Sequence, residues 1–178
     1  MSSHNAQSNR HRELDNKKCT DALNWLLEGA WLCRFEFCRT GWELWFSLDE
    51  GYPSVSAGLI DFPFELVLQA SVAGSGELES EAEVAGNLVR ATRHKISEVT
   101  VDAESNLCLM FGKEAQVRFA GKNDPVDEVW SLYRPQSASH KRGFGEPCLM
   151  QSYFGELFMA QEFDAAISAT VNTARDES

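Results

Sequence analysis

Basic residues are missing from a long stretch of this sequence. The chain has 178 residues, with 16 Lys and Arg against 27 Asp and Glu, and its formal net charge is −11. From Thr40 to Val89, fifty residues include no Lys or Arg but nine acidic residues. Nucleic-acid binding needs a surplus of positive charge on some face. The charge balance therefore argues against a general nucleic-acid binder and favours a basic or neutral protein partner.

Long apolar runs are also missing. The sequence has no stretch of about 18 apolar residues, which a membrane-spanning helix would need. Residues 1–18 are polar and charged and do not have the apolar centre of a signal peptide. We therefore expect a cytoplasmic protein with no membrane contact. A chain of this length buries roughly 70% of its unfolded surface, which is enough for one domain without disulfide or metal support.

The motifs of metal and catalytic sites do not occur either. The five cysteines form no CxxC pair, and the four histidines are scattered singly, whereas zinc sites need such ligands at short spacing. Cys33 and Cys38 could pair, but buried thiols in a reducing compartment are the preferred interpretation. The sequence has no nucleophile elbow, phosphate-binding loop, dinucleotide fingerprint or HExxH motif. We expect a protein that is not an enzyme and that uses no cofactor or metal.

Hydrophobic periodicity divides the chain into two halves of similar pattern, about 13–69 and 77–133. Residues 1–12 show no periodicity and are expected to form a disordered arm. Each half starts with a helical pattern and continues with strands of alternating polarity that are separated by short turns. The expected helices cover 13–28 and 79–92, and the expected strands cover 31–37, 42–48, a third around Val55, and then 96–101, 107–111 and 116–119.

Each half ends in a similar closing segment, at 61–68 and at 124–132. A polar loop follows at 133–147, and the remaining strands and a helix are expected within 147–174, with the strands around Gly155 and the helix over 161–174. Taken together, the expected helices and strands predict a single α+β domain over 13–178. It is built of antiparallel meanders, each preceded by a helix, and has a C-terminal helix. The pattern is compatible with one sheet or with two.

Glu36 and Glu43 lie on neighbouring strands of the first expected hairpin. Two facing carboxylates could act as general acid and base. Like charges directly opposite each other are unfavourable in a sheet, so the preferred interpretation places the two glutamates offset on a solvated face, with Arg34 and Arg39 nearby.

The acidic stretch is the clearest candidate for a functional surface. Its glutamates near residue 80 could simply favour the start of a helix through the helix dipole. The functional interpretation is an acidic face that steers a basic partner, with aromatic side chains as apolar anchors. Trp42 is expected on the core face, which leaves Trp45 and Tyr52 as the better anchors. The candidate contact residues are Glu43, Trp45, Asp49, Glu50, Tyr52, Asp61, Glu65, Glu77, Glu79, Glu81 and Glu83.

A repeated unit of helix, strand, turn, strand, acidic or Gly turn and strand occurs at Leu26 to Val55 and at Leu88 to Phe119, and Trp130-Ser-Leu-Tyr133 closes it. This unit resembles the small bacterial immunity proteins of polymorphic and contact-dependent growth inhibition toxin systems. The resemblance implies a non-catalytic cytoplasmic protein that binds a cognate basic toxin domain, often a nuclease, and blocks its active site. It implies no particular binding residues.

Two further hypotheses come from other functional classes. A small-molecule-binding or enzymatic β-domain would have its pocket between the two meanders and would use Tyr133, His140 and Arg142. A structural or adaptor module would self-associate as a homo-oligomer through strand edges or aromatic side chains, at an interface containing Trp45 or Trp130.

Overall fold

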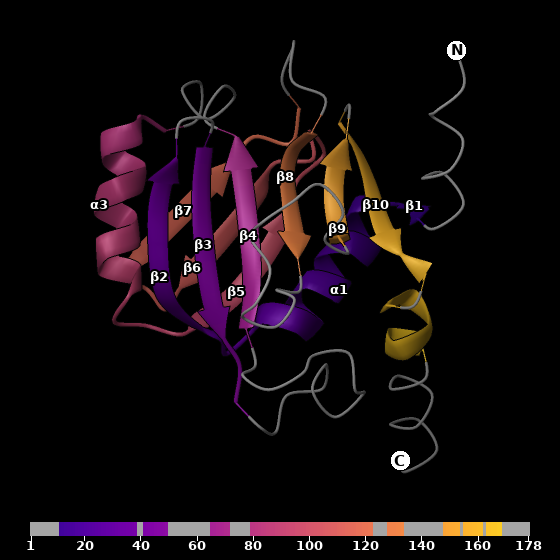
Figure 1. Cartoon of the computed structure of the whole chain (residues 1–178), viewed down its shortest axis with the longest axis horizontal. Coiled ribbons are helices and arrows are strands. Elements are labelled where there is room, and N and C mark those ends of the chain that lie inside the picture. The colour runs from indigo at the N-terminus through magenta and orange to yellow at the C-terminus, as the bar shows by residue number, and fades with distance from the viewer. Residues whose placement is uncertain are drawn as a thin grey trace.

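Two antiparallel sheets and the helices packed on them form the α+β fold of this protein, as expected. A computed structural model describes residues 11–38, 41–49, 65–71, 79–122, 128–133, 148–153, 155–161 and 163–168. Within these residues the larger sheet has seven strands in the order β1-β10-β9-β8-β4-β3-β2, and the smaller sheet has three in the order β5-β6-β7. Figure 1 shows the larger sheet in front of the smaller one. The two halves therefore contribute to two sheets.

The first meander consists of β2 (Trp31–Cys38), β3 (Gly41–Ser47) and β4 (Glu65–Ser71). The first two strands are confirmed, since alternating polarity is what a sheet with one core-facing side requires. The third strand expected around Val55 lies outside the described residues. The described neighbour of β3 is β4, which falls in the first closing segment.

The second meander forms the smaller sheet, with β5 (Ile96–Val101), β6 (Leu107–Phe111) and β7 (Ala115–Phe119). All three strands are confirmed within one or two residues. Along β6, buried residues alternate with partly exposed ones, so one face of this sheet points into the core.

The closing segments of the two halves lie side by side in the larger sheet. β8 (Glu128–Tyr133) pairs antiparallel with β4, and Leu132 lies opposite Leu68. The sheet continues through β9 (Cys148–Tyr153) and β10 (Glu156–Ala160) to β1 (His11–Leu14). The strands expected around Gly155 are therefore confirmed.

Helix α1 (Asn16–Leu27) begins three residues later than predicted. The Asp15 side chain accepts a hydrogen bond of 2.8 Å from the backbone N–H of Lys18, as an N-cap does, and His11–Leu14 pair with β10 instead. Residues 1–10 of the expected arm lie outside the described residues, but its last two residues belong to β1. The helix ends as expected before Gly29, whose φ of 84° is the left-handed conformation that glycine permits.

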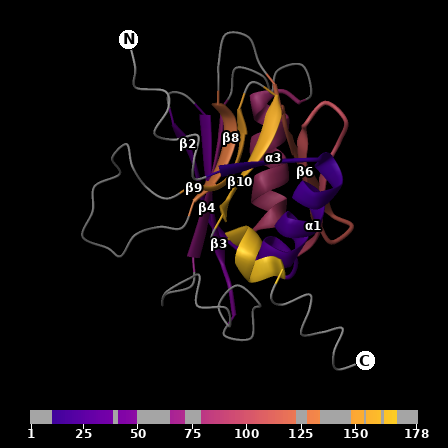
Figure 2. The same cartoon turned by 90° about the vertical axis from the view of Figure 1, so that its right-hand side faces the viewer.

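Both helices pack against the smaller sheet. α1 contacts β5, and α3 (Glu81–Ala91) contacts β7. Figure 2 shows the larger sheet nearly edge-on, with α1, α3 and β6 on the same side of it. The helix that starts the first half thus lies on the sheet of the second half, so the halves interlock.

The space between the sheets is filled by one apolar core. Its largest fully buried side chains include Phe46 and Trp130 from the larger sheet and Phe111 and Phe119 from the smaller one. Phe163 joins this core 5.6 Å from the Trp25 ring, in a helical segment at 163–168 that confirms the expected C-terminal helix as far as residue 168. The described space between the two meanders, where the pocket hypothesis places its ligand, is filled by these apolar side chains.

Candidate functional site

The larger sheet has one face that points away from the smaller sheet and from α1 and α3, and we call it the outer face. Residues directly opposite each other on neighbouring strands share a face. The strand register aligns Glu36, Glu43, Gln69 and Ser131 across β2, β3, β4 and β8. These four residues form a polar row on the outer face, while Leu44 and Leu68 beside them point into the core.

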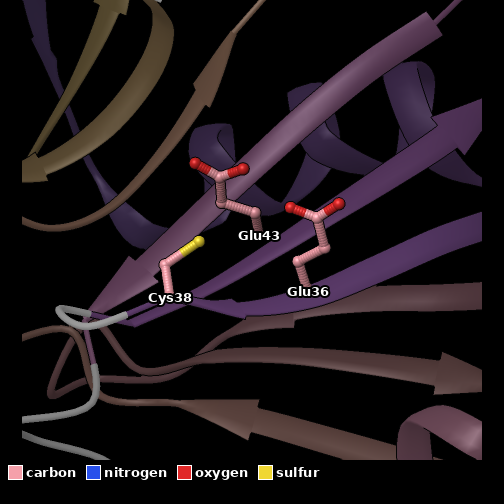
Figure 3. Close-up of side chains that lie close together, drawn as sticks. All are labelled: Glu36, Cys38 and Glu43. Carbon is pink, nitrogen blue, oxygen red and sulfur yellow. The ribbon is translucent and has the colours of Figure 1, made fainter.

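Glu36 and Glu43 lie directly opposite each other at the start of this row. Figure 3 shows both carboxylates pointing the same way from β2 and β3. Cys38 pairs with Gly41, so only two residues separate the strands, and this register fixes the glutamate pair. The preferred expectation of offset glutamates is therefore wrong.

Other side chains contact these carboxylates. The Gln69 Nε2 donates a hydrogen bond of 3.0 Å to Glu43 Oε1, and Glu43 is only 8% exposed. Arg34 Nε lies 3.6 Å from Glu36 Oε1, with both side chains about half exposed. An ion pair this exposed contributes little to stability, but it places a positive charge beside the row.

Cys38 adds a third donor atom next to the two carboxylates. Its Sγ and one oxygen each of Glu36 and Glu43 all lie within 4.8 Å of one another. Thiolate and carboxylate are ligands that zinc accepts, but a structural zinc site has four protein ligands. This group offers three, and Arg34 and Gln69 already contact its carboxylates. It is the set of described residues that comes nearest to a metal site.

Trp45 does not protrude as the expected anchor. It is 7% exposed, and the Arg34 guanidinium lies 3.9 Å from the centre of its ring in a cation–π contact. The aromatic side chains exposed in the described part of the chain are Trp31 and Phe37 on β2, at 40% and 51%. Their exposure was not predicted, because alternating polarity alone does not show that β2 is an edge strand.

The described acidic candidates lie on different elements and have local roles. Asp49 forms an exposed ion pair of 3.3 Å with Lys95. Glu83 and Ser80 form a capping box at the start of α3, which adds hydrogen bonds to the helix-dipole role that the sequence allowed. Burial raises the pKa of Glu79, although hydrogen bonds from Asn87 and Arg118 oppose this.

Glu81 is exposed on the first turn of α3. Glu65 lies opposite Ser47 in the β3–β4 register. Glu50, Tyr52, Asp61 and Glu77 lie outside the described residues, as do His140 and Arg142 of the pocket hypothesis. Tyr133 belongs to β8, where its hydroxyl accepts a hydrogen bond of 3.0 Å from Ser131 Oγ. Gln69 and Ser131 were not predicted, since only the strand order brings them beside Glu43.

The cysteines at 19, 33, 38 and 108 are free thiols, so Cys33 and Cys38 do not pair. The expected burial is found for Cys19 but is wrong for Cys33, which is exposed. None of the described helices is both long and apolar enough to cross a membrane. Comparison with protein-family models, curated proteins and solved structures finds no match to this chain.

Proposed function

We propose that this protein is a non-catalytic cytoplasmic immunity protein that binds a cognate basic toxin domain, in particular a nuclease, and occludes its active site. The observation that carries the proposal is the charge distribution, with fifty consecutive residues that contain nine acids and no Lys or Arg. An acidic surface of this kind raises the association rate with a basic partner and disfavours acidic ones. The resemblance in repeat pattern supplies the class of partner.

Among the described acidic residues, some side chains are exposed to solvent and others are buried or already contact neighbouring groups. Glu81 is exposed and forms no hydrogen bond or ion pair with another described residue, whereas Glu79 and Glu83 have local partners at the start of α3. Glu43 is nearly buried in the polar row. A basic partner would therefore meet the N-terminal turn of α3, around Glu81, rather than the polar row.

The first experiment is affinity capture from native cytoplasm at low and at high salt, with bound proteins identified by mass. We expect one basic protein that dissociates as salt rises, because exposed charges are screened beyond about 10 Å at 0.1 M salt. The purified partner should have nuclease activity that the protein inhibits at one-to-one stoichiometry. A partner without toxic activity would contradict the immunity function.

Charge reversal then tests the acidic face itself. Glu77→Lys with Glu81→Lys should weaken capture and reduce its salt dependence. The matched control is Glu104→Lys with Glu114→Lys, which changes the net charge equally at exposed turns of the smaller sheet. Equal weakening by both pairs would show that net charge acts alone, and would contradict a specific acidic face.

A further inference from the structure

The β2 strand forms an edge of the larger sheet. Seven of its eight residues pair with β3 on one side, and Cys33 lies at an irregularity in that pairing. On the other side, within the described part of the chain, the contact is a single bridge between Trp31 and Lys95. An edge strand presents unpaired backbone N–H and C=O groups that another strand can complete. A strand of this length is long enough to form a new ladder.

Apolar surface is exposed on the same strand. Of the three large hydrophobic side chains exposed in the described residues, two belong to β2. Phe37 is 51% exposed and contacts the buried Trp42 ring edge-on at 4.7 Å between centroids. A strand added beside β2 would cover the outward side of Phe37 and remove this apolar surface from water.

The charges of β2 are complementary to a second copy of the same strand. Arg34 and Glu36 share the outer face, on either side of Phe35. If two β2 strands pair antiparallel about Phe35, Arg34 of each copy lies opposite Glu36 of the other. Registers centred on Arg34 or on Glu36 would instead place like charges opposite each other, which is unfavourable. The charges therefore select one register.

This register also extends the polar row. Glu36 already lies opposite Glu43, so the row ends at the sheet edge in two adjacent carboxylates. Arg34 of a second copy would become the next member of the row, on the far side of Glu36. The guanidinium would then face the end of the row that carries the excess negative charge.

We propose that two copies of this chain associate through β2, antiparallel about Phe35, and join their larger sheets into one continuous sheet. The same residues of both copies form the interface, as in a two-fold dimer. The irregularity between Leu32 and Arg34 interrupts the regular ladder, so the pairs that define the register are Arg34 with Glu36 and Phe35 with Phe35 of the other copy. Such an interface is small, and the dimer is concentration-dependent. This inference does not depend on the proposed function, because purified chain alone tests it.

The test is sedimentation equilibrium of the purified chain from about 10 µM to about 1 mM, the range in which weak interfaces associate. We expect the mean mass to rise from one chain toward two. Arg34→Glu alone and Glu36→Arg alone should each weaken association about tenfold. Each variant places like charges opposite each other in both pairs formed by position 34 of one copy and position 36 of the other. The matched controls, Lys18→Glu and Glu104→Arg, change exposed charges at the start of α1 and at the β5–β6 turn and should leave association unchanged.

Two combinations make the register itself testable. Arg34→Glu with Glu36→Arg in one chain restores both cross-pairs and should restore the wild-type association. An equimolar mixture of the two single variants should form a heterodimer, since Glu at 34 and 36 of one chain faces Arg at 36 and 34 of the other. A chain that stays monomeric throughout the range, or combinations that restore nothing, would overturn the proposal.

Discussion

Asn24 on helix α1 pairs with the backbone of Val99 on β5 as a neighbouring strand would. Its Nδ2 donates to the Val99 carbonyl at 2.7 Å, and its Oδ1 accepts from the Val99 N–H at 2.7 Å. Four residues earlier, Thr20 Oγ1 accepts from the Val101 N–H at 2.9 Å. Another four residues earlier, Asn16 donates to the Asp102 carbonyl. One face of α1 thus closes the outer edge of the smaller sheet, which protects it from pairing with other strands.

Replacing Asn24 should therefore destabilise the fold more than its size suggests. Asn24→Ala leaves the N–H and C=O of the buried Val99 without their partner, and we expect a loss of about 2–3 kcal/mol in the free energy of unfolding. Urea denaturation measures it. Lys17→Ala, on an exposed turn of the same helix, is the control and should change stability by less than about 0.5 kcal/mol. Equal effects would show that Asn24 does not hold the edge.

Gly121 should not tolerate a side chain. A Cβ at this position would overlap the carbonyl of Ser105, a backbone atom that cannot move aside cheaply. That carbonyl also accepts a hydrogen bond of 3.2 Å from Trp130 Nε1, and Ser105 Oγ donates to the Gly155 carbonyl at 2.8 Å. We expect Gly121→Ala to cost about 3 kcal/mol of unfolding free energy, since it overpacks this junction between the sheets.

Gly86 offers the matched control. It lies inside α3, where an added Cβ would have no atom within 4 Å apart from its chain neighbours and the backbone of the helix itself. Gly86→Ala should raise stability by about 0.5–1 kcal/mol, because alanine loses less backbone entropy in a helix. Thermal unfolding of both variants distinguishes them by sign. A loss of stability in Gly86→Ala would contradict the open space beside this residue in α3. A Gly121→Ala variant as stable as wild type would contradict the close contact between Gly121 and the Ser105 carbonyl.

Two glutamates near the start of α3 should affect stability with opposite dependence on pH. Burial raises the pKa of Glu79, and its Oε2 accepts no hydrogen bond from the described residues. The folded state therefore holds this proton more tightly than the unfolded state, and stability falls as pH rises above the ordinary value of 4.5 through the raised pKa. Glu79→Gln should be more stable than wild type at pH 7, and the gain should shrink as pH falls toward 4.5.

Glu83 should behave in the opposite way. Hydrogen bonds from the Ser80 side chain, and then from its backbone, lower the pKa of Glu83. Its contribution is present above pH 4.5 and is lost as pH falls through the lowered pKa. Glu83→Ala should therefore be less stable than wild type at pH 7, with a deficit that fades in acid. Parallel pH profiles of the Glu79 and Glu83 variants in chemical denaturation would contradict these assignments.

The cysteines should differ strongly in reactivity. Burial, with a smaller contribution from Asp15, raises the pKa of Cys19 to about 12, so almost no thiolate forms at pH 8. Cys33 is an exposed free thiol. Iodoacetamide followed by peptide mass spectrometry should modify Cys33 at least about tenfold faster than Cys19 in the native protein. Both should react alike in guanidinium, and equal rates in the native state would contradict the burial of Cys19.

Local patterns along the chain predicted most of the elements. Strands such as β3 and β6 were found because a half-buried strand must alternate in polarity. The end of α1 was found because Gly29 permits the left-handed conformation. The start of α1 was placed too early, because the pairing of His11–Leu14 with β10 is a contact across most of the chain, and helical spacing does not record it.

The candidate site was predicted only in part. The hairpin indicated that Glu36 and Glu43 are neighbours, yet their exact opposition depends on the register that follows from Cys38 and Gly41. Trp45 was expected to be exposed, but Arg34 lies over its ring. Trp45 and Trp130, which were expected at a self-association interface, are both buried, and the exposed aromatic side chains of the described residues are on β2.

The sequence by itself determined the α+β class, the two meanders and the acidic character, because periodicity, turn residues and charge are local properties of the chain. Only the tertiary structure decided that the halves form two sheets, that β4 and β8 join, and that α1 closes the edge of β5. These arrangements depend on pairings between residues 60 to 150 positions apart, as between Leu68 and Leu132 or His11 and Ala160. Many strand orders bury the same apolar faces, and side-chain packing together with backbone hydrogen bonds selects one of them.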